Sequence, residues 1–321
     1  MAYETGTATD SNDLFAKFRT FITSHADLVS ANQAWEELEY SVDDADTAQL
    51  YLRGKGLSDS DSIYVNVYKF LEGVDSANWG FCGATGYVPG NDYSTQPGAT
   101  TRSTYMLLHT TTLSYWFFAN GRRFIIVAKV GGTVYQSAYG GFLIPYDLPT
   151  ENPYPLMINA SSAEFDQRYS WISDNSHTSM DRGGYEANDA DVNAWAINPA
   201  GAWKKISSYW SQNENAFAYN LPSSSYVAGV WPYVSAGQTY GRPDYVLPAP
   251  GDEYLLRKLV VLNLHSSKSE SNFFGEYDGV YNVSGANNAA ENTLTIGGDT
   301  YIVFSNIYRS GLADFFVVKQ E

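Results

Sequence analysis

The chain has 321 residues, of which 44% are hydrophobic and 17% charged, a composition typical of a folded globular protein with one large or two medium domains. Its formal net charge of −16 disfavours nucleic acid and anionic membrane surfaces as partners, because both are bound through lysine and arginine. No apolar run approaches the roughly 20 residues of a membrane span, and the single cysteine, Cys82, excludes an internal disulfide and a cysteine-based zinc site.

The first predicted element is an amphipathic helix near the N-terminus. It follows a polar, acidic opening at residues 1–13 that lacks the apolar stretch of a signal peptide, so we expect none here. Asp10 or Ser11 is expected to cap the helix by accepting hydrogen bonds from its first free amides. Apolar side chains then recur at helical spacing, at Leu14, Phe15, Phe18, Phe21 and Ile22. This spacing predicts one apolar, aromatic face that packs against the rest of the protein.

After the helix, the spacing of apolar residues changes from a helical to a strand period. Residues 50–53 and 63–70 are rich in β-branched and aromatic residues, which pleated surfaces prefer. We therefore expect two strands there, separated by a turn that is rich in Gly, Ser and Asp.

A β-hairpin is the clearest local prediction. Two apolar and aromatic runs, residues 114–119 and 122–128, flank Asn120-Gly121, a pair that favours the positive φ angles of a type I′ turn. A third strand is expected at residues 134–139. Together these segments predict an antiparallel meander, and the N-terminal helix is expected to cover one of its faces.

Residues 145–160 contain four prolines, so neither a regular helix nor a central strand is expected there. The segment predicts a domain boundary or a long structured linker, between a helix-plus-antiparallel-β domain at residues 1–150 and an aromatic, loop-rich β domain at residues 151–321. Periodicity is weak over residues 161–252, which we interpret as loops on a β-scaffold. Strand patterns return at residues 255–264, 279–283 and 301–305. The predicted fold class is mainly β, with antiparallel, sandwich-like sheets and one N-terminal amphipathic helix, and whether the last strands return to the first sheet stays open.

The sequence carries none of the common catalytic or cofactor motifs. A nucleophile elbow, a phosphate-binding loop and a dinucleotide fingerprint are all missing. The four histidines, His25, His109, His177 and His265, lie far apart and lack the spacing of a zinc-binding helix, which favours structural roles. We accordingly expect no cofactor, no metal ion and no enzymatic activity. Glycoside hydrolysis by two carboxylates that converge in the fold is the enzymatic alternative.

One acidic stretch superficially matches a calcium-binding loop. Asp189, Asp191 and Asn193 have the spacing of its first three ligands. However, Ala194 stands where the loop needs glycine, and Ala200 stands where it needs a bidentate glutamate. A solvated acidic loop is therefore the favoured interpretation.

Aromatic residues make up 16% of the chain, which suits either sandwich cores or surfaces that meet a neighbouring chain. Four tryptophans in the weakly periodic region are candidates for an interface or for stacking on sugar rings. They are Trp195, Trp203, Trp210 and Trp231. Anchoring loops or filling an interface is favoured over glycan binding for these side chains.

The two ends of the chain and the meander carry a further pattern. It comprises residues 1–8 leading into the helix, residues 116–144, and residues 274–285, 292–304 and 314–319. Within the last part, Asp278-Gly279 and Gly297-Gly298-Asp299 predict tight turns between strands. These segments resemble a family of virion structural proteins of tailed bacteriophages.

The resemblance implies a non-enzymatic component of the virion that is made in the cytoplasm of the bacterial host. Its expected partners are copies of itself, in a homo-oligomer, and other virion proteins, without insertion into a membrane. The neck or collar, the tail tip or baseplate, and a fibre attachment are all open as its place in the particle. The first alternative is a receptor- or carbohydrate-binding module at the tail tip that contacts host-surface glycan, and the second is a glycan hydrolase.

Overall fold

The computed structural model of the chain describes residues 1–42, 47–73, 75–163, 165, 177–180, 193–206, 226–231, 254–265, 272–312 and 314–320. Within these ranges the fold consists of three open antiparallel sheets and an N-terminal helical segment. That segment is α1 (Ser11–Ser24), followed by the short α2 (Ala26–Ser30). The predicted fold class is confirmed: the protein is mainly β, with sandwich-like antiparallel sheets and an N-terminal amphipathic helix.

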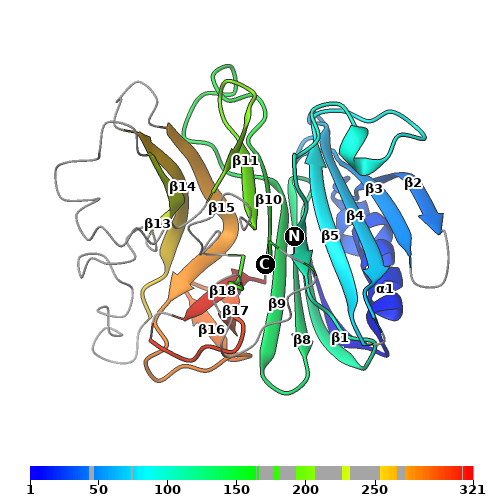
Figure 1. Cartoon of the computed structure of the whole chain (residues 1–321). Coiled ribbons are helices and arrows are strands. Elements are labelled where there is room, and N and C mark those ends of the chain that lie inside the picture. The colour runs from blue at the N-terminus through cyan, green and yellow to red at the C-terminus, as the bar shows by residue number, and fades with distance from the viewer. Residues whose placement is uncertain are drawn as a thin grey trace.

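The sheets stack in three layers, with a seven-stranded sheet in the middle (Figure 1). Its strands lie in the order β1 (Ala2–Ala8), β7 (Leu113–Ala119), β8 (Arg123–Val130), β9 (Val134–Phe142), β10 (Leu156–Ala160), β11 (Ala194–Ile197) and β12 (Trp203–Lys205). A five-stranded sheet on one side has the order β2 (Glu36–Val42), β3 (Ala48–Gly54), β4 (Ile63–Leu71), β5 (Ala77–Ala84) and β6 (Thr104–Met106). A six-stranded sheet on the other side has the order β13 (Tyr226–Trp231), β14 (Arg257–His265), β15 (Asn272–Val283), β18 (Phe315–Lys319), β17 (Asp299–Ser305) and β16 (Thr293–Ile296). The strands predicted at residues 50–53, 63–70 and 134–139 and in the C-terminal third are therefore confirmed.

The middle strands of the central sheet are buried on both faces, and alternate side chains of these strands enter two different cores. In β8, Phe124 and Ile126 face the five-stranded sheet, whereas Ile125 and Val127 face the six-stranded sheet. Because successive side chains of a strand point to opposite faces, a strand that is covered on both sides needs apolar residues throughout. This explains the unbroken apolar runs on either side of Asn120 in the sequence.

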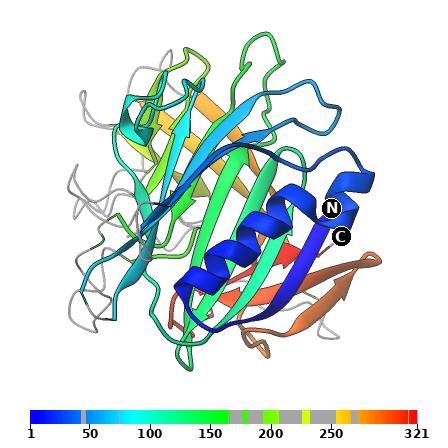
Figure 2. The same ribbon diagram turned by 90° about the vertical axis from the view of Figure 1, so that its right-hand side faces the viewer.

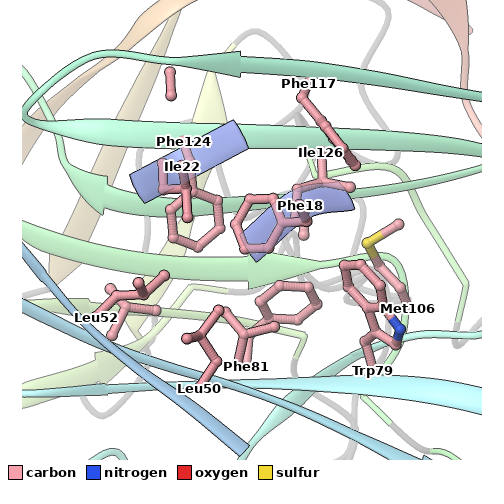
Figure 3. Close-up of a cluster of buried hydrophobic side chains, with 14 of the residues drawn as sticks. Phe18, Ile22, Leu50, Leu52, Trp79, Phe81, Met106, Phe117, Phe124 and Ile126 are labelled. Carbon is pink, nitrogen blue, oxygen red and sulfur yellow. The ribbon is translucent and has the colours of Figure 1, made fainter. Parts of the chain in front are cut away.

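Helix α1 lies in the core next to the five-stranded sheet and covers the β1–β7 margin of the central sheet (Figure 2). Asp10 caps it as predicted, because its Oδ1 accepts a hydrogen bond from the backbone N–H of Asp13 at 2.8 Å. Its five predicted apolar residues are all buried. The ring of Phe18 meets Phe117 and Phe124 edge-on, with ring centroids 5.5 and 5.2 Å apart (Figure 3). Over the described part of the chain, no helix is long and apolar enough to cross a membrane.

The hairpin at Asn120-Gly121 is confirmed, but its predicted turn type is wrong. Neither residue has a positive φ angle. The Oδ1 atom of Asn120 instead accepts hydrogen bonds from the backbone N–H groups of Arg122 and Arg123, at 2.8 and 3.0 Å. Glycine is needed at position 121 for space, since a Cβ atom there would lie 1.8 Å from the backbone oxygen of Gly56.

The turn predicted at Asp278-Gly279 is also wrong, because both residues lie inside β15. Gly279 has a φ angle of +77°, and the register with β14 shifts close by, between Lys258 and Val260. The pair therefore forms part of a bulge in a continuous strand. The other predicted turn, at Gly297-Gly298, is confirmed between β16 and β17.

The expectation that residues 145–160 contain no central strand is wrong. Residues 156–160 form β10, which is fully buried and lies between β9 and β11 in the central sheet. The four prolines all precede β10, so none of them removes a donor from its ladder. The domain boundary predicted near residue 150 stays a prediction, although strands from both sides of it share the central sheet. The last strands, β14 to β18, form the six-stranded sheet together with β13.

Candidate assembly surface

Two of the four predicted tryptophans are described with their side chains, and both are packed against the protein. Trp195, on β11, is 9% exposed. Trp203, on β12, donates a hydrogen bond from Nε1 to the backbone oxygen of Gly98 at 2.8 Å, and its ring lies over Gly83. Trp210 and the side chain of Trp231 lie outside the described residues. A role of these four in an interface or in glycan stacking stays a prediction.

The outer face of the five-stranded sheet has a shallow pocket that the sequence analysis missed. Four tyrosines line it: Tyr51, Tyr64, Tyr87 and Tyr93. Asn66, also in the lining, is 5% exposed, and its Oδ1 atom has no hydrogen-bond partner. The free space is about 10 Å³, which is room for one water molecule and not for a sugar ring. The alternation of Tyr64, Asn66 and Tyr68 along β4 is the sequence signal for this face.

Burial sets the chemistry of the tyrosine hydroxyls in this pocket. Burial, together with a hydrogen bond to Glu39, raises the pKa of Tyr87 to about 12. Burial likewise raises the pKa of Tyr51 above its usual value. Both hydroxyls therefore stay protonated at neutral pH and act as hydrogen-bonding groups, not as bases.

A larger cavity, of about 210 Å³, lies where α1 begins, beside β4 and β5. Asp10, Ser11, Asn12, Lys69 and Thr110 supply its polar lining. The Lys69 side chain is 6% exposed and donates a hydrogen bond to Oδ1 of Asn12. A carboxylate, an ammonium group and hydroxyls thus belong to residues that line this cavity, which suits water or a small polar solute.

Among the described residues, neither the histidines nor the calcium-like loop forms a metal site. His25 caps α2, because its Nδ1 atom accepts a hydrogen bond from the backbone N–H of Asp27 at 3.3 Å. Of the calcium-like loop, Asp189 and Asp191 lie outside the described residues, and the buried Asn193 donates a hydrogen bond to the backbone of Ala160. Among the residues that the structure covers, no three histidine, cysteine, aspartate or glutamate side chains are placed to hold a metal ion.

The three open sheets end in edge strands, whose outward N–H and C=O groups pair with another chain unless the edge is protected. β2 is protected by Glu36, Glu37 and Glu39, and by a register shift between the last two. β6 and β12 have three residues each, and β12 also carries Lys204 and Lys205. β16 has four residues. β13 forms the other edge of the six-stranded sheet, and most of its side chains lie outside the described residues.

The outer edge of β1, called the β1 edge below, lacks these protections. β1 runs from Ala2 to Ala8 in unbroken register with β7 and contains no proline, lysine or arginine. Its single charged residue, Glu4, accepts a hydrogen bond from the hydroxyl of Tyr115 at 2.8 Å. No described strand pairs with the β1 edge, which forms the margin of the central sheet (blue strand in Figure 2).

The surroundings of the β1 edge suit a neighbouring chain. Thr5 and Thr7 are exposed on the strand itself, and β-branched threonine is favoured on strand surfaces. Val29 is 56% exposed on α2, which contacts β1, and Met1 is 36% exposed beside the strand. A strand added at this edge would therefore gain backbone hydrogen bonds and cover apolar side chains.

The β1 edge was not predicted from the sequence, because residues 2–8 are a polar lead without an apolar alternation. The structure brings Trp195 and Trp203 to the opposite margin of the central sheet, on β11 and β12. Neither a protein-family model nor a curated protein matches the chain.

Proposed function

We propose that the chain is a structural subunit of a tailed bacteriophage virion and that it acts by assembling with copies of itself and with other virion proteins. The β1 edge carries this proposal. A long, regular edge with a single charged side chain offers a row of backbone donors and acceptors to a further strand. A protein that remains a monomer normally protects such an edge, as the glutamates and the register shift protect β2.

The segments that resemble tailed-phage virion proteins make up one contiguous part of the molecule. Residues 116–144 contain β8, β9 and half of β7, and residues 274–285, 292–304 and 314–319 contribute to β15, β16, β17 and β18. The two groups pack against each other in the core of the six-stranded sheet, where the rings of Trp116 and Phe304 meet at 5.3 Å. The resemblance thus coincides with one sheet-on-sheet core, which supports a shared structural role.

The receptor-binding alternative has less support from the described surface. The tyrosine pocket has room for about one water molecule. Trp195 is nearly buried, and Trp203 is fixed by its hydrogen bond to Gly98. Glycan recognition needs exposed rings beside polar groups, and among the described tryptophans these two offer no open platform.

The experiment is to look for the chain in purified particles of the phage that encodes it. Virions are purified by density gradient, their proteins are identified by mass spectrometry, and an antibody to the chain is located by electron microscopy. We expect a fixed copy number per particle and label at one symmetric position of the neck or tail. Absence of the chain from infectious particles would contradict the proposal.

A further inference from the structure

The β1 edge needs a strand partner of defined chemistry, and the strand itself suits a second copy of this chain. A two-fold axis brings the same surface patch of two subunits together, so that every contact occurs twice. For an edge strand, such an axis places the strand antiparallel to its own copy. Each residue must therefore be compatible with the residue that it faces in the second copy. The residues of β1, Ala-Tyr-Glu-Thr-Gly-Thr-Ala, meet this requirement.

We infer that two copies pair through their β1 edges, antiparallel and centred on Thr5, so that the two central sheets become one continuous sheet. This inference rests on the proposed assembly role of the β1 edge. With Thr5 on the axis, Ala2 faces Ala8, Tyr3 faces Thr7, and Glu4 faces Gly6 of the second copy. The partly or fully exposed residues of the strand, Tyr3 to Thr7, are then all paired, and the buried Ala2 and Ala8 lie at its two ends.

The charge on Glu4 selects this register. Centring the pair on Thr5 puts each Glu4 opposite a glycine, which has no side chain, and puts a threonine opposite a threonine, a favourable cross-strand pair. Centring it on Glu4 would place two carboxylates directly opposite each other, which is destabilising. Centring it on Gly6 would carry Ala2 beyond the strand, to Asp10.

Two other edges of the described sheets suit self-pairing less well. In a full-length antiparallel pair of β2 strands, centred on residue 39, Glu39 would directly face Glu39 of the second copy. β12 presents two lysines over three residues, so self-pairing there would bring ammonium groups together. The β1 edge combines length with a sequence that avoids like charges in its own antiparallel register.

A single cysteine on the axis tests the inference. Directly opposed residues of antiparallel strands have Cα atoms about 4.5 or 5.5 Å apart, and both distances allow a disulfide. The native thiol of Cys82 is buried and does not compete. Thr5→Cys is therefore expected to form a covalent dimer, with twice the 35.5 kDa mass of one chain, under mild oxidation in dilute solution.

Two matched variants serve as controls. Thr7→Cys lies on the same strand but faces Tyr3 of the second copy, so its two thiols are too far apart to join. Thr20→Cys is exposed on α1 and reports random collisions. Cross-linking of Thr5→Cys at the rate of Thr20→Cys would overturn the inference, and so would faster cross-linking of Thr7→Cys than of Thr5→Cys.

Charge provides an independent measurement. Thr5→Lys places two ammonium groups on the axis, and lysine is a common protection of natural sheet edges. The mass by light scattering is expected to fall by half relative to the unchanged chain and to Thr20→Lys, with the circular dichroism spectrum preserved. If the chain is found in virions but its Thr5→Cys variant does not cross-link, the pairing is refuted and the proposed function is not. If Thr5→Cys cross-links but the chain is absent from virions, the proposed function is refuted and the pairing is not.

Discussion

Asn120 donates a hydrogen bond from Nδ2 to Oδ2 of Asp278 at 2.8 Å and so joins the hairpin tip of the central sheet to the bulge in β15. Beside it, the fully buried Arg123 donates from Nε to the backbone oxygen of Asp278 at 3.0 Å, and Nε lies 3.7 Å from Oδ2. On the other side, Trp35 donates from Nε1 to the backbone oxygen of Asn120 at 2.8 Å. The tip of one hairpin therefore links all three layers.

We expect Asp278→Asn to destabilise the protein by about 2–3 kcal/mol, because it leaves the buried guanidinium of Arg123 without its opposite charge. The Nη1 atom of Arg123 already has no hydrogen-bond partner. Urea-induced unfolding measures the loss. The control is Asp299→Asn in the same sheet, which removes a more exposed pair with Lys319 and should cost less than about 1 kcal/mol. Equal losses in both variants would show that burial of Arg123 does not matter.

Gly121→Ala is expected to destabilise the protein by about 1–3 kcal/mol through overpacking. The added Cβ would meet the backbone oxygen of Gly56, whose own N–H donates to the oxygen of Gly121 at 2.8 Å. Gly132→Ala is the matched control, because its Cβ would meet nothing within 4 Å and its φ angle is not positive. A change within about 0.5 kcal/mol is expected there. Thermal melting compares the two, and indistinguishable melting temperatures would argue against close approach at Gly121.

Features set by local spacing were predictable from the sequence. The cap at Asp10 and the buried face around Phe18 follow from a helical period over a few residues. The hairpin around Asn120 follows from two apolar runs on either side of a turn pair. Its turn type was not predictable, because the need for glycine at position 121 comes from Gly56, far away in the sequence.

Features set by distant partners were not predictable. β10 follows a proline-rich segment, and its place in the central sheet depends on pairing with Gly140 and Ala196, on strands before and after it. The β1 edge is the clearest case in the candidate site. Residues 2–8 are a strand because β7, more than 100 residues later, offers a partner from Leu113 to Ala119. A polar strand at a sheet margin has no apolar alternation to reveal it.

The native Cys82 thiol is expected to resist alkylation and disulfide exchange in the folded protein. Burial raises its pKa to about 11, and its side chain is 3% exposed beside the hydroxyl of Ser103 at 3.0 Å. The reactive thiolate is therefore scarce at pH 8 and out of reach of reagents. A colorimetric thiol assay should find no reaction in buffer and one thiol per chain in guanidinium chloride. Rapid reaction of the native chain would mean that this part of the sheet opens readily.

Association through the β1 edge should strengthen as salt is added. Each chain carries a net charge of −16, so two copies repel each other at low ionic strength. Salt at about 0.3 M shortens the range of this repulsion to well under 10 Å, whereas backbone hydrogen bonds between strands are affected little. Light scattering at about 0.02 and 0.3 M NaCl should show a higher dimer fraction at the higher concentration. Dissociation by salt would instead indicate an interface held by opposite charges.

Glu291 is expected to make folding stability depend on pH. Its Oε1 atom accepts hydrogen bonds from Lys129 and Tyr135, both at 2.5 Å, and so ties the central sheet to the segment before β16. Burial alone would raise the pKa of Glu291, but these two hydrogen bonds outweigh burial and lower it below the usual 4.5. The unfolded chain then binds a proton more readily than the folded one, so stability is gained as pH rises through this range and lost as pH falls below about 4.5.

Glu291→Gln should remove this contribution while keeping the shape of the side chain. Because 40% of the Glu291 side chain is exposed and water screens the pair, the expected loss at pH 7 is less than about 1 kcal/mol. Tyr135→Phe removes one of the two hydrogen-bond donors to Glu291. The free energy of unfolding should then change less with pH than in the unchanged chain, but it should still change. Unfolding in urea at several pH values from 3 to 7 measures both variants. The difference between Glu291→Gln and the unchanged chain should vanish at the acid end, and a difference that is constant across the range would contradict the ion pair.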